Sequence, residues 1–319
     1  MDGYYLRERY SSIKSEKPIK PPLLKPGAGI GIIAPAGPVK AHELDPGIQY
    51  LRSKGYTVIL GKHLYEQEGY LAGNDEARIE DLHRMVLNLE VGAVFCARGG
   101  YGCMRLLERI DFELFRKHPK PFIGYSDITA LLLALYHKSG WITFHGPMVK
   151  DLASGHQGDM DTLLDMLGSP APWNLSLEGC RIIKPGRARG PLIGGNLSLL
   201  CHMAGTEYMP ELRGCILFIE DRGEMPYRLD RMLTSLKLSG QLQEVAAIVA
   251  GEFVSCGRKE DIDRMLEDIT SLMDIPVISG APIGHGKRNI PFPIGLDAVL
   301  DTSQFLLQSS EAPITNETD

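Results

Sequence analysis

The sequence lacks any hydrophobic run long enough to cross a membrane. Hydrophobic residues make up 44% of its 319 residues, but polar residues interrupt every apolar stretch well before the roughly 20 residues that span a bilayer. The first residues, Met1 to Arg9, have no apolar core of the kind found in secretory signals. We therefore expect a cytoplasmic protein with no membrane partner.

An excess of positive charge is also missing. The chain carries 34 Lys and Arg against 40 Asp and Glu, which gives a formal net charge of −6. Proteins that bind nucleic acids or anionic membranes need clustered positive charge. We therefore expect no nucleic-acid partner.

The six cysteines lack the paired CxxC spacing of a zinc site. Most of them lie in apolar runs, which is typical of reduced, buried thiols. No cluster of His, Cys, Asp and Glu with metal-ligand spacing stands out elsewhere. The sequence therefore predicts no metal site.

What the chain does have is a regular alternation of strand-like and helix-like segments. Short apolar runs predict strands, and apolar residues at helical spacing predict helices between them. The strands are expected near residues 30–34, 56–60, 93–97 and 122–124, and the helices near 42–54, 74–88 and 127–138. Such alternation is typical of an α/β fold with a parallel, Rossmann-like sheet.

A chain of this length usually divides into two domains. Glycine and proline cluster between residues 151 and 190, and a second, smaller α/β unit follows. We expect an N-terminal arm at 1–26, a Rossmann-like domain at 27–165, an interdomain linker at 166–190, a C-terminal domain at 191–308 and a C-terminal tail at 309–319.

One loose motif is rejected by its context. Residues 29–34 match the dinucleotide fingerprint G-x-G-x-x-A. That fingerprint must follow a strand and open a helix, whereas here the glycines lie inside the strand and two prolines follow. We do not expect nucleotide binding at this segment.

Three turns at the ends of predicted strands are candidates for a site. They are residues 35–38, 98–102 and 124–127, and active groups in parallel sheets gather beyond the carboxyl ends of strands. Ser126 stands at the corner of the third turn, where it is either a nucleophile or a helix cap. The adjacent Gly99 and Gly100 either bring N–H donors close to a ligand or only form a tight turn.

Two further residues are partners that a serine nucleophile would need. Glu220 closes a strand, where it could orient a histidine or cap the following helix. His285 lies between two glycines, where it is either an accessible base or a surface residue. Together with Ser126 they form a nucleophile–base–orienter set, although spacing alone cannot show that they meet.

Six segments, in order, resemble the LD-carboxypeptidases (muramoyltetrapeptide carboxypeptidases, serine peptidase family S66). The segments are residues 31–36 (GIIAPA), 98–102 (RGGYG), 124–127 (GYSD), 194–197 (GGNL), 219–221 (IED) and 284–285 (GH). The resemblance covers about residues 22 to 305 and is far more specific than any single segment.

The resemblance implies a role for each candidate residue. Ser126 would be the nucleophile, His285 the general base and then acid, and Glu220 the carboxylate that orients His285. The oxyanion hole would use the backbone N–H of Asp127 and that of a glycine in the 98–102 turn, Gly99 or Gly100. Arg98 and Tyr101 are weaker candidates for substrate binding, and Arg98 is equally a residue that could pin the turn.

The resemblance also implies the reaction and the fold. The enzyme would hydrolyse the terminal D-alanine from cytoplasmic murein tetrapeptides during peptidoglycan recycling, through an acyl-enzyme and without a cofactor. The N-terminal domain would be Rossmann-like, the smaller C-terminal domain a mixed, swivelling-type α/β unit, and the site would lie between them. Members of the family are commonly homodimers.

Two alternatives stay open. A related branch of the family cleaves peptidyl-nucleotide antibiotics of the microcin C type and confers immunity, although residues 220–228 (EDRGEMPYR) favour the cell-wall branch. From another class, the chain could be a non-catalytic, two-lobed protein that binds a small molecule.

Overall fold

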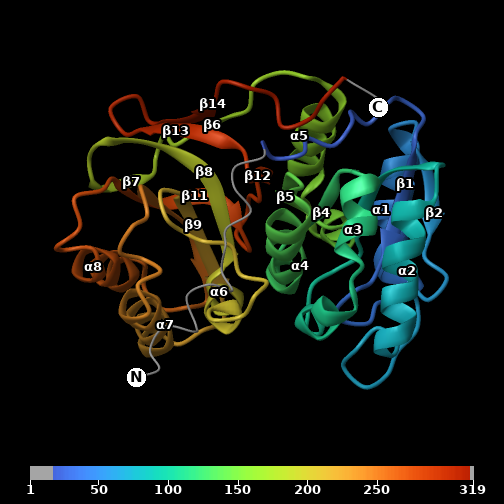
Figure 1. The fold of residues 1–319 in the computed structure, drawn as a ribbon, viewed down its shortest axis with the longest axis horizontal. Coiled ribbons are helices and arrows are strands. Elements are labelled where there is room, and N and C mark those ends of the chain that lie inside the picture. Colours follow the sequence, from blue (N-terminus) through green and yellow to red (C-terminus); the bar gives the residue numbers. More distant parts are fainter. Residues whose placement is uncertain (1–16, 317–319) are drawn as a thin grey trace, which may run out of the picture.

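The computed structural model describes residues 17–316, and these form two β-sheets with helices packed around them (Figure 1). The first sheet has six strands in the order β12-β5-β4-β3-β1-β2. Its parallel strands are β1 (Gly29–Ile33), β2 (Thr57–Leu60), β3 (Val91–Cys96), β4 (Phe122–Gly124) and β5 (Thr143–His145). The predicted α/β class with a Rossmann-like parallel sheet is confirmed.

Helices alternate with these strands, and three of the five overlap the segments near 42–54, 74–88 and 127–138 that the sequence predicts as helices. The helices are α1 (Ala41–Ser53), α2 (Asp75–Leu87), α3 (Phe112–Lys117), α4 (Thr129–Ala134) and α5 (Gln157–Gly168). In α1 the residues Leu44, Ile48 and Leu51 are buried, so the helical stripe in the sequence faces the core. Asn74 caps α2, because its side chain accepts a hydrogen bond from the backbone N–H of Ala77.

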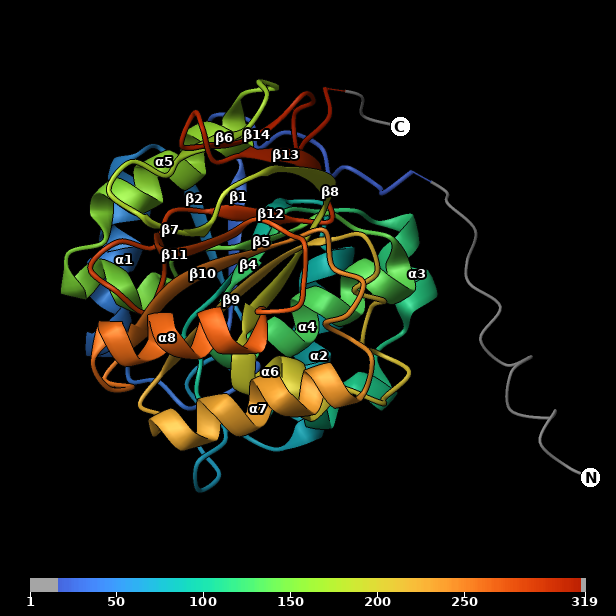
Figure 2. The ribbon, with the colours of Figure 1, turned by 90° about the vertical axis from the view of Figure 1, so that its left-hand side faces the viewer.

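The second sheet is mixed, with eight strands in the order β6-β14-β13-β8-β9-β10-β11-β7. These strands are β6 (Asn174–Ser176), β7 (Arg181–Lys184), β8 (Arg187–Asn196), β9 (Ile216–Arg222), β10 (Ala247–Val254), β11 (Val277–Gly284), β13 (Asp297–Asp301) and β14 (Leu306–Ser309). Four consecutive strands of this sheet, β8 to β11, are parallel. The helices of this half are α6 (Leu197–Met203), α7 (Pro226–Leu238) and α8 (Lys259–Ile269), and Figure 2 shows α7 and α8 side by side.

One strand connects the two halves. β12 (Phe292–Ile294) follows the second-sheet strand β11 in the sequence, yet it pairs antiparallel with β5 of the first sheet. The expected linker, residues 166–190, is also part of the second sheet, because it contains β6 and β7. The chain therefore changes sheet several times rather than once.

The described parts of the two expected terminal segments lie against the fold. Ile19 forms a β-bridge with Trp141, and Pro22 forms one with Thr315. Leu24 and Ile314 are buried. The remaining residues of these segments, 1–16 and 317–319, lie outside the described residues.

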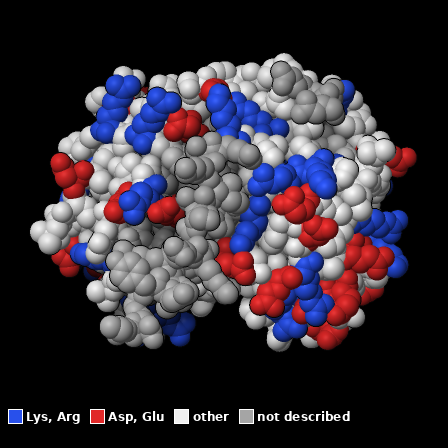
Figure 3. All heavy atoms as spheres, in the orientation of Figure 1, with Lys and Arg blue, Asp and Glu red and all other residues white. Residues whose placement is uncertain are grey.

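The surface carries both signs of charge. On the face seen in Figure 3, Lys and Arg are interspersed with Asp and Glu. Within residues 17–316, none of the helices has the length and apolar character needed to cross a membrane.

Candidate active site

Ser126 lies at a strained corner between β4 and a short 3-10 turn, Ser126–Ile128. Its φ angle is +62°, and the only other non-glycine residues with positive φ in the described part of the chain are Ser255 and Phe305. Neither the 3-10 turn nor α4 has a side-chain cap hydrogen bond. The helix-cap interpretation of Ser126 is therefore not supported, and strain of this kind is common at functional sites.

The glycine turn at 98–102 lies directly against Ser126. A Cβ atom on Gly99 would be 3.0 Å from Ser126 Oγ and 3.6 Å from the backbone nitrogen of Asp127. The carbonyl of Gly99 accepts a hydrogen bond of 3.2 Å from the backbone N–H of Gly37. The three turns predicted from the sequence therefore meet at one place.

Arg98 spans two of these turns. Its Nε donates to the carbonyl of Gly99 and its Nη1 to the carbonyl of Pro38, each at 3.2 Å. These contacts favour the interpretation in which Arg98 pins the turn. Tyr101 is 52% exposed, and its ring meets that of Tyr70 edge to face at 5.5 Å.

Glu220 and His285 are joined directly. Glu220 lies near the end of β9 and is fully buried. Its Oε2 lies 2.6 Å from His285 Nδ1 and also accepts the backbone N–H of His285 at 3.3 Å. With Nδ1 against a carboxylate, the imidazole has a fixed orientation and its Nε2 remains to accept a proton.

A glycine makes this approach possible. Gly284 has a φ angle of +102°, and a Cβ atom there would lie 2.5 Å from Glu220 Oε2. Any other residue at position 284 would push the His285 backbone away from the carboxylate.

The two halves of the chain meet at the site through aromatic rings. Tyr125, next to Ser126, packs on the His285 ring with a centroid distance of 4.8 Å. Ser126 thus comes from the first sheet, and Glu220 and His285 come from the second. Among the described residues, no hydrogen bond joins the Ser126 hydroxyl to His285.

Beneath this contact lies His145, at the end of β5. It is fully buried, and its ring packs on Tyr125 at 5.6 Å and on Phe218 at 4.8 Å. Burial, with the charge of His285 as a smaller cause, lowers the pKa of His145 to about 3. Burial likewise raises the pKa of the Tyr125 hydroxyl, so both groups are neutral beneath the site.

Asn196 is a residue whose position the sequence did not reveal. Its Nδ2 donates to Asp221 Oδ1 at 3.0 Å and to Glu220 Oε1 at 3.4 Å, and its backbone N–H donates to Thr129 Oγ1 at 3.2 Å. Asn196 and Glu220 are register partners in the parallel pair β8 and β9. Asn196 closes β8 and Glu220 lies near the end of β9 in the same sheet, and this shared position was the available signal.

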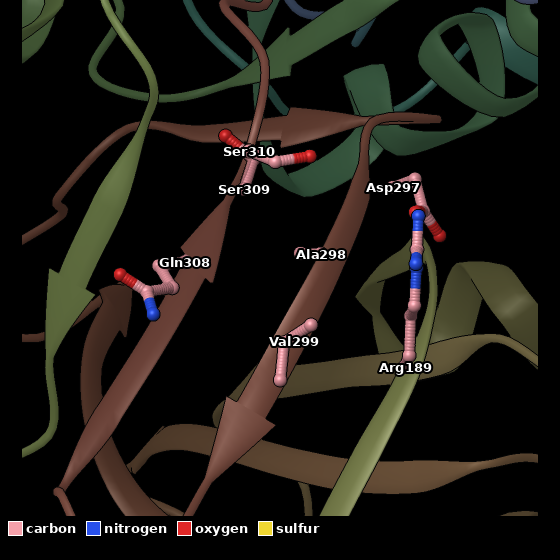
Figure 4. Close-up of a pocket in the computed structure, with 7 residues that line it drawn as sticks. All are labelled: Arg189, Asp297, Ala298, Val299, Gln308, Ser309 and Ser310. Carbon is pink, nitrogen blue, oxygen red and sulfur yellow. The ribbon is translucent and has the colours of Figure 1, made fainter.

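A hollow elsewhere on the second sheet contains none of the predicted site residues (Figure 4). It is lined by Arg189, Asp297, Ala298, Val299, Gln308, Ser309 and Ser310. Arg189 and Asp297 form an ion pair at its edge, with an Nε–Oδ2 distance of 2.7 Å. We assign this hollow no role.

Comparison with known proteins identifies relatives for both halves of the chain. A family model described as the LD-carboxypeptidase N-terminal domain matches residues 30–146, and one described as the LD-carboxypeptidase C-terminal domain matches residues 189–300. A probable murein peptide carboxypeptidase of Bacillus subtilis is 40% identical over 294 residues, which cover 89% of this chain and 92% of the relative.

Two solved structures extend the comparison. The muramoyltetrapeptide carboxypeptidase of Oxalobacter formigenes matches with a TM-score of 0.78 at 35% identity, covering 88% of this chain and 97% of its own. The microcin immunity protein MccF, in complex with glutamyl sulfamoyl guanosine, matches with a TM-score of 0.87 at 26% identity, covering 93% and 100%. A protein named as a carboxypeptidase and one named as an immunity protein therefore share this fold.

Proposed function

Because this chain belongs to the LD-carboxypeptidase family, we propose that it is a serine carboxypeptidase that removes the terminal D-alanine from murein tetrapeptides. The observation that carries the proposal is the 2.6 Å contact between Glu220 Oε2 and His285 Nδ1 beside the strained corner at Ser126. The names of the relatives support a murein peptide as the substrate.

In the proposed mechanism Ser126 is the nucleophile. His285 Nε2 takes the proton from Ser126 Oγ, which attacks the carbonyl carbon of the amide before D-alanine. Glu220 holds the imidazole and stabilises the imidazolium that forms. His285 then gives the proton to the leaving amine of D-alanine, and an acyl-enzyme remains on Ser126. Water, activated by the same histidine, releases the tripeptide.

The negative charge of the tetrahedral intermediate needs donors that are already in place. We assign this role to the backbone N–H groups of Asp127 and of Gly99 or Gly100. The close approach of Gly99 to both Ser126 Oγ and the Asp127 nitrogen supports the assignment. Tyr101, exposed on the same turn, is proposed to contact the substrate.

The proposal places the enzyme in the cytoplasm, where murein peptides released by wall turnover are recycled. We further propose that the enzyme is a homodimer and needs no cofactor. A second candidate is hydrolysis of a peptidyl nucleotide, which is favoured by the fold similarity to the MccF complex.

Mass spectrometry of the products decides between these functions. Purified enzyme is incubated with a tetrapeptide that ends in an L,D-linked D-alanine, with its D,D-linked counterpart and with a peptidyl sulfamoyl nucleotide. We expect D-alanine only from the first. Cleavage of the nucleotide alone would favour the immunity branch, and binding of the tetrapeptide without cleavage would favour a non-catalytic protein.

The first prediction is that Ser126→Ala abolishes this release. The loss should be on the order of 10⁴-fold or more, since the nucleophile is removed while the rest of the site stays. Ser255→Ala is a matched control. Ser255 also has a positive φ angle, but it follows β10 and is not one of the proposed site residues. Normal turnover by Ser126→Ala would contradict the proposed mechanism.

A further inference from the structure

We propose that Arg78 and Asp127 are positioning residues that hold one peptide unit, Gly102–Cys103, between them and thereby set the glycine turn beside Ser126. We call Arg78, this peptide unit and Asp127 the peptide clamp. The inference rests on the proposed function, because it concerns the oxyanion donors of that same site.

The peptide clamp is built from two buried charges of opposite sign. Asp127 Oδ2 accepts the backbone N–H of Cys103 at 2.9 Å. Arg78 Nη1 donates to the carbonyl oxygen of Gly102 at 3.0 Å. Asp127 is 4% exposed and Arg78 is 2% exposed. The same peptide bond is therefore bound at its N–H end by an anion and at its C=O end by a cation.

The other contacts of Arg78 extend this bracing to a second turn. Arg78 Nη1 also donates to the carbonyl oxygen of Pro35 at 2.5 Å, and Nη2 pairs with Asp75. Within the 35–38 turn, Gly37 donates its N–H to Gly99. The glycine turn is thus fixed at Gly99 on one side and at Gly102–Cys103 on the other.

No residue other than glycine fits at position 102. Its φ angle is +131°, and a Cβ atom there would lie 2.6 Å from Arg78 Nη1. The guanidinium therefore occupies the space in which a side chain would stand.

The position of Asp127 links the peptide clamp to catalysis. Asp127 follows the proposed nucleophile, and its own N–H is a proposed oxyanion donor, while its carboxylate holds the turn that carries the other donor. The peptide clamp therefore sets the spacing between the two donors. An error in that spacing costs stabilisation of the transition state, whereas binding of the ground state is little affected.

Asp127→Asn tests the inference, because it keeps the shape and removes the charge. We expect kcat to fall ~10- to 100-fold with KM nearly unchanged. The affinity of a peptide boronic acid, which mimics the tetrahedral intermediate, should fall by the same factor as kcat. A residue that served stability alone would change neither kcat nor this affinity in the folded enzyme.

Asp81→Asn is the matched control. Asp81 is also a buried carboxylate that accepts two backbone N–H groups of a turn, those of Lys62 at 2.8 Å and His63 at 2.9 Å. This turn is not among the three that meet at Ser126. Asp81→Asn should lower Tm and leave kcat and the boronate affinity unchanged.

Arg78→Lys provides a second variant in case Asp127→Asn does not fold. Lysine keeps the positive charge but lacks the fork that reaches two carbonyl groups and a carboxylate, so we expect the same loss in kcat. Its control is Arg109→Lys, because Arg109 pairs with Glu76 of α2 from an exposed position.

Two outcomes would overturn the inference. If the wild type releases D-alanine while Asp127→Asn or Arg78→Lys keeps its kcat, the peptide clamp does not position the donors and the proposed function stands. If the wild type releases no D-alanine from any substrate, the proposed function fails, and the inference fails with it.

Discussion

The absence of a side chain at Gly284 allows Glu220 to reach His285. We predict that Gly284→Ala lowers kcat/KM on the order of 10²- to 10⁴-fold, because the new methyl group would lie 2.5 Å from Glu220 Oε2 and would force the carboxylate and the His285 backbone apart. Gly155→Ala is the control: its φ angle is +99°, similar to that of Gly284, but no atom lies within 4 Å of the added Cβ. Assays of D-alanine release on both variants separate the steric effect from backbone strain, and equal activities would contradict the prediction.

His145 should make the protein sensitive to acid. Its pKa is about 3 in the folded protein against an ordinary value of 6.5, so the unfolded chain binds the proton first. The contribution of neutral His145 is therefore fully present above pH 6.5 and is lost as the pH falls toward 3. Between pH 6.5 and about pH 4 the loss amounts to about 3 kcal/mol.

His145→Phe keeps a ring between Tyr125 and Phe218 and removes this titration. We predict that the free energy of unfolding of the variant, measured with urea at several pH values, falls less steeply with acid than that of the wild type. Parallel curves for the two proteins would show that His145 does not cause the acid sensitivity.

At the scale of elements, α2 positions Arg78 and therefore depends on a proper start. Asn74 Oδ1 accepts the N–H of Ala77 at 2.8 Å. We predict that Asn74→Ala lowers the free energy of unfolding by about 1 kcal/mol, because one N–H of the first turn loses its partner. Asn74→Ser, which can cap the helix in the same way, should restore most of the loss in urea unfolding.

Elements with a local signal could be predicted from the sequence, and elements without one could not. The strand at 30–34 and the helices at 42–54 and 74–88 have periodic apolar residues or a capping residue, and the structure has β1, α1 and α2 there. β6 (Asn174–Ser176) has a single apolar residue and β12 (Phe292–Ile294) contains a proline, so neither has a strand signal of its own. Their partners in the sheets lie far away in the sequence, so pairing rather than propensity defines them.

The candidate site divides in the same way. Ser126, Glu220 and His285 stood out because each lies in a distinctive turn or at a strand end. The contacts of Asn196 and Arg78 did not, because they depend on which strands are neighbours and on how α2 packs. A buried arginine in a helix gives no sign, in the sequence alone, that it reaches two turns.

At the scale of the whole molecule, the pairing of β12 with β5 joins the two halves of the chain. We therefore predict a single unfolding transition. Trp141 packs on Phe115 at 5.2 Å in the first half, and Trp173 donates its Nε1 hydrogen to the carbonyl of Pro291, next to β12. In the variants Trp173→Phe and Trp141→Phe, the fluorescence of the remaining tryptophan should change together with that variant's circular dichroism. Separate midpoints would mean that the halves unfold independently.

β12 also protects an edge. Without it, β5 (Thr143–His145) would be the last strand of the first sheet, and its unpaired N–H and C=O groups would be free to template another chain. A fragment that contains only β1 to β5 would therefore tend to aggregate, although it includes every parallel strand of the first sheet.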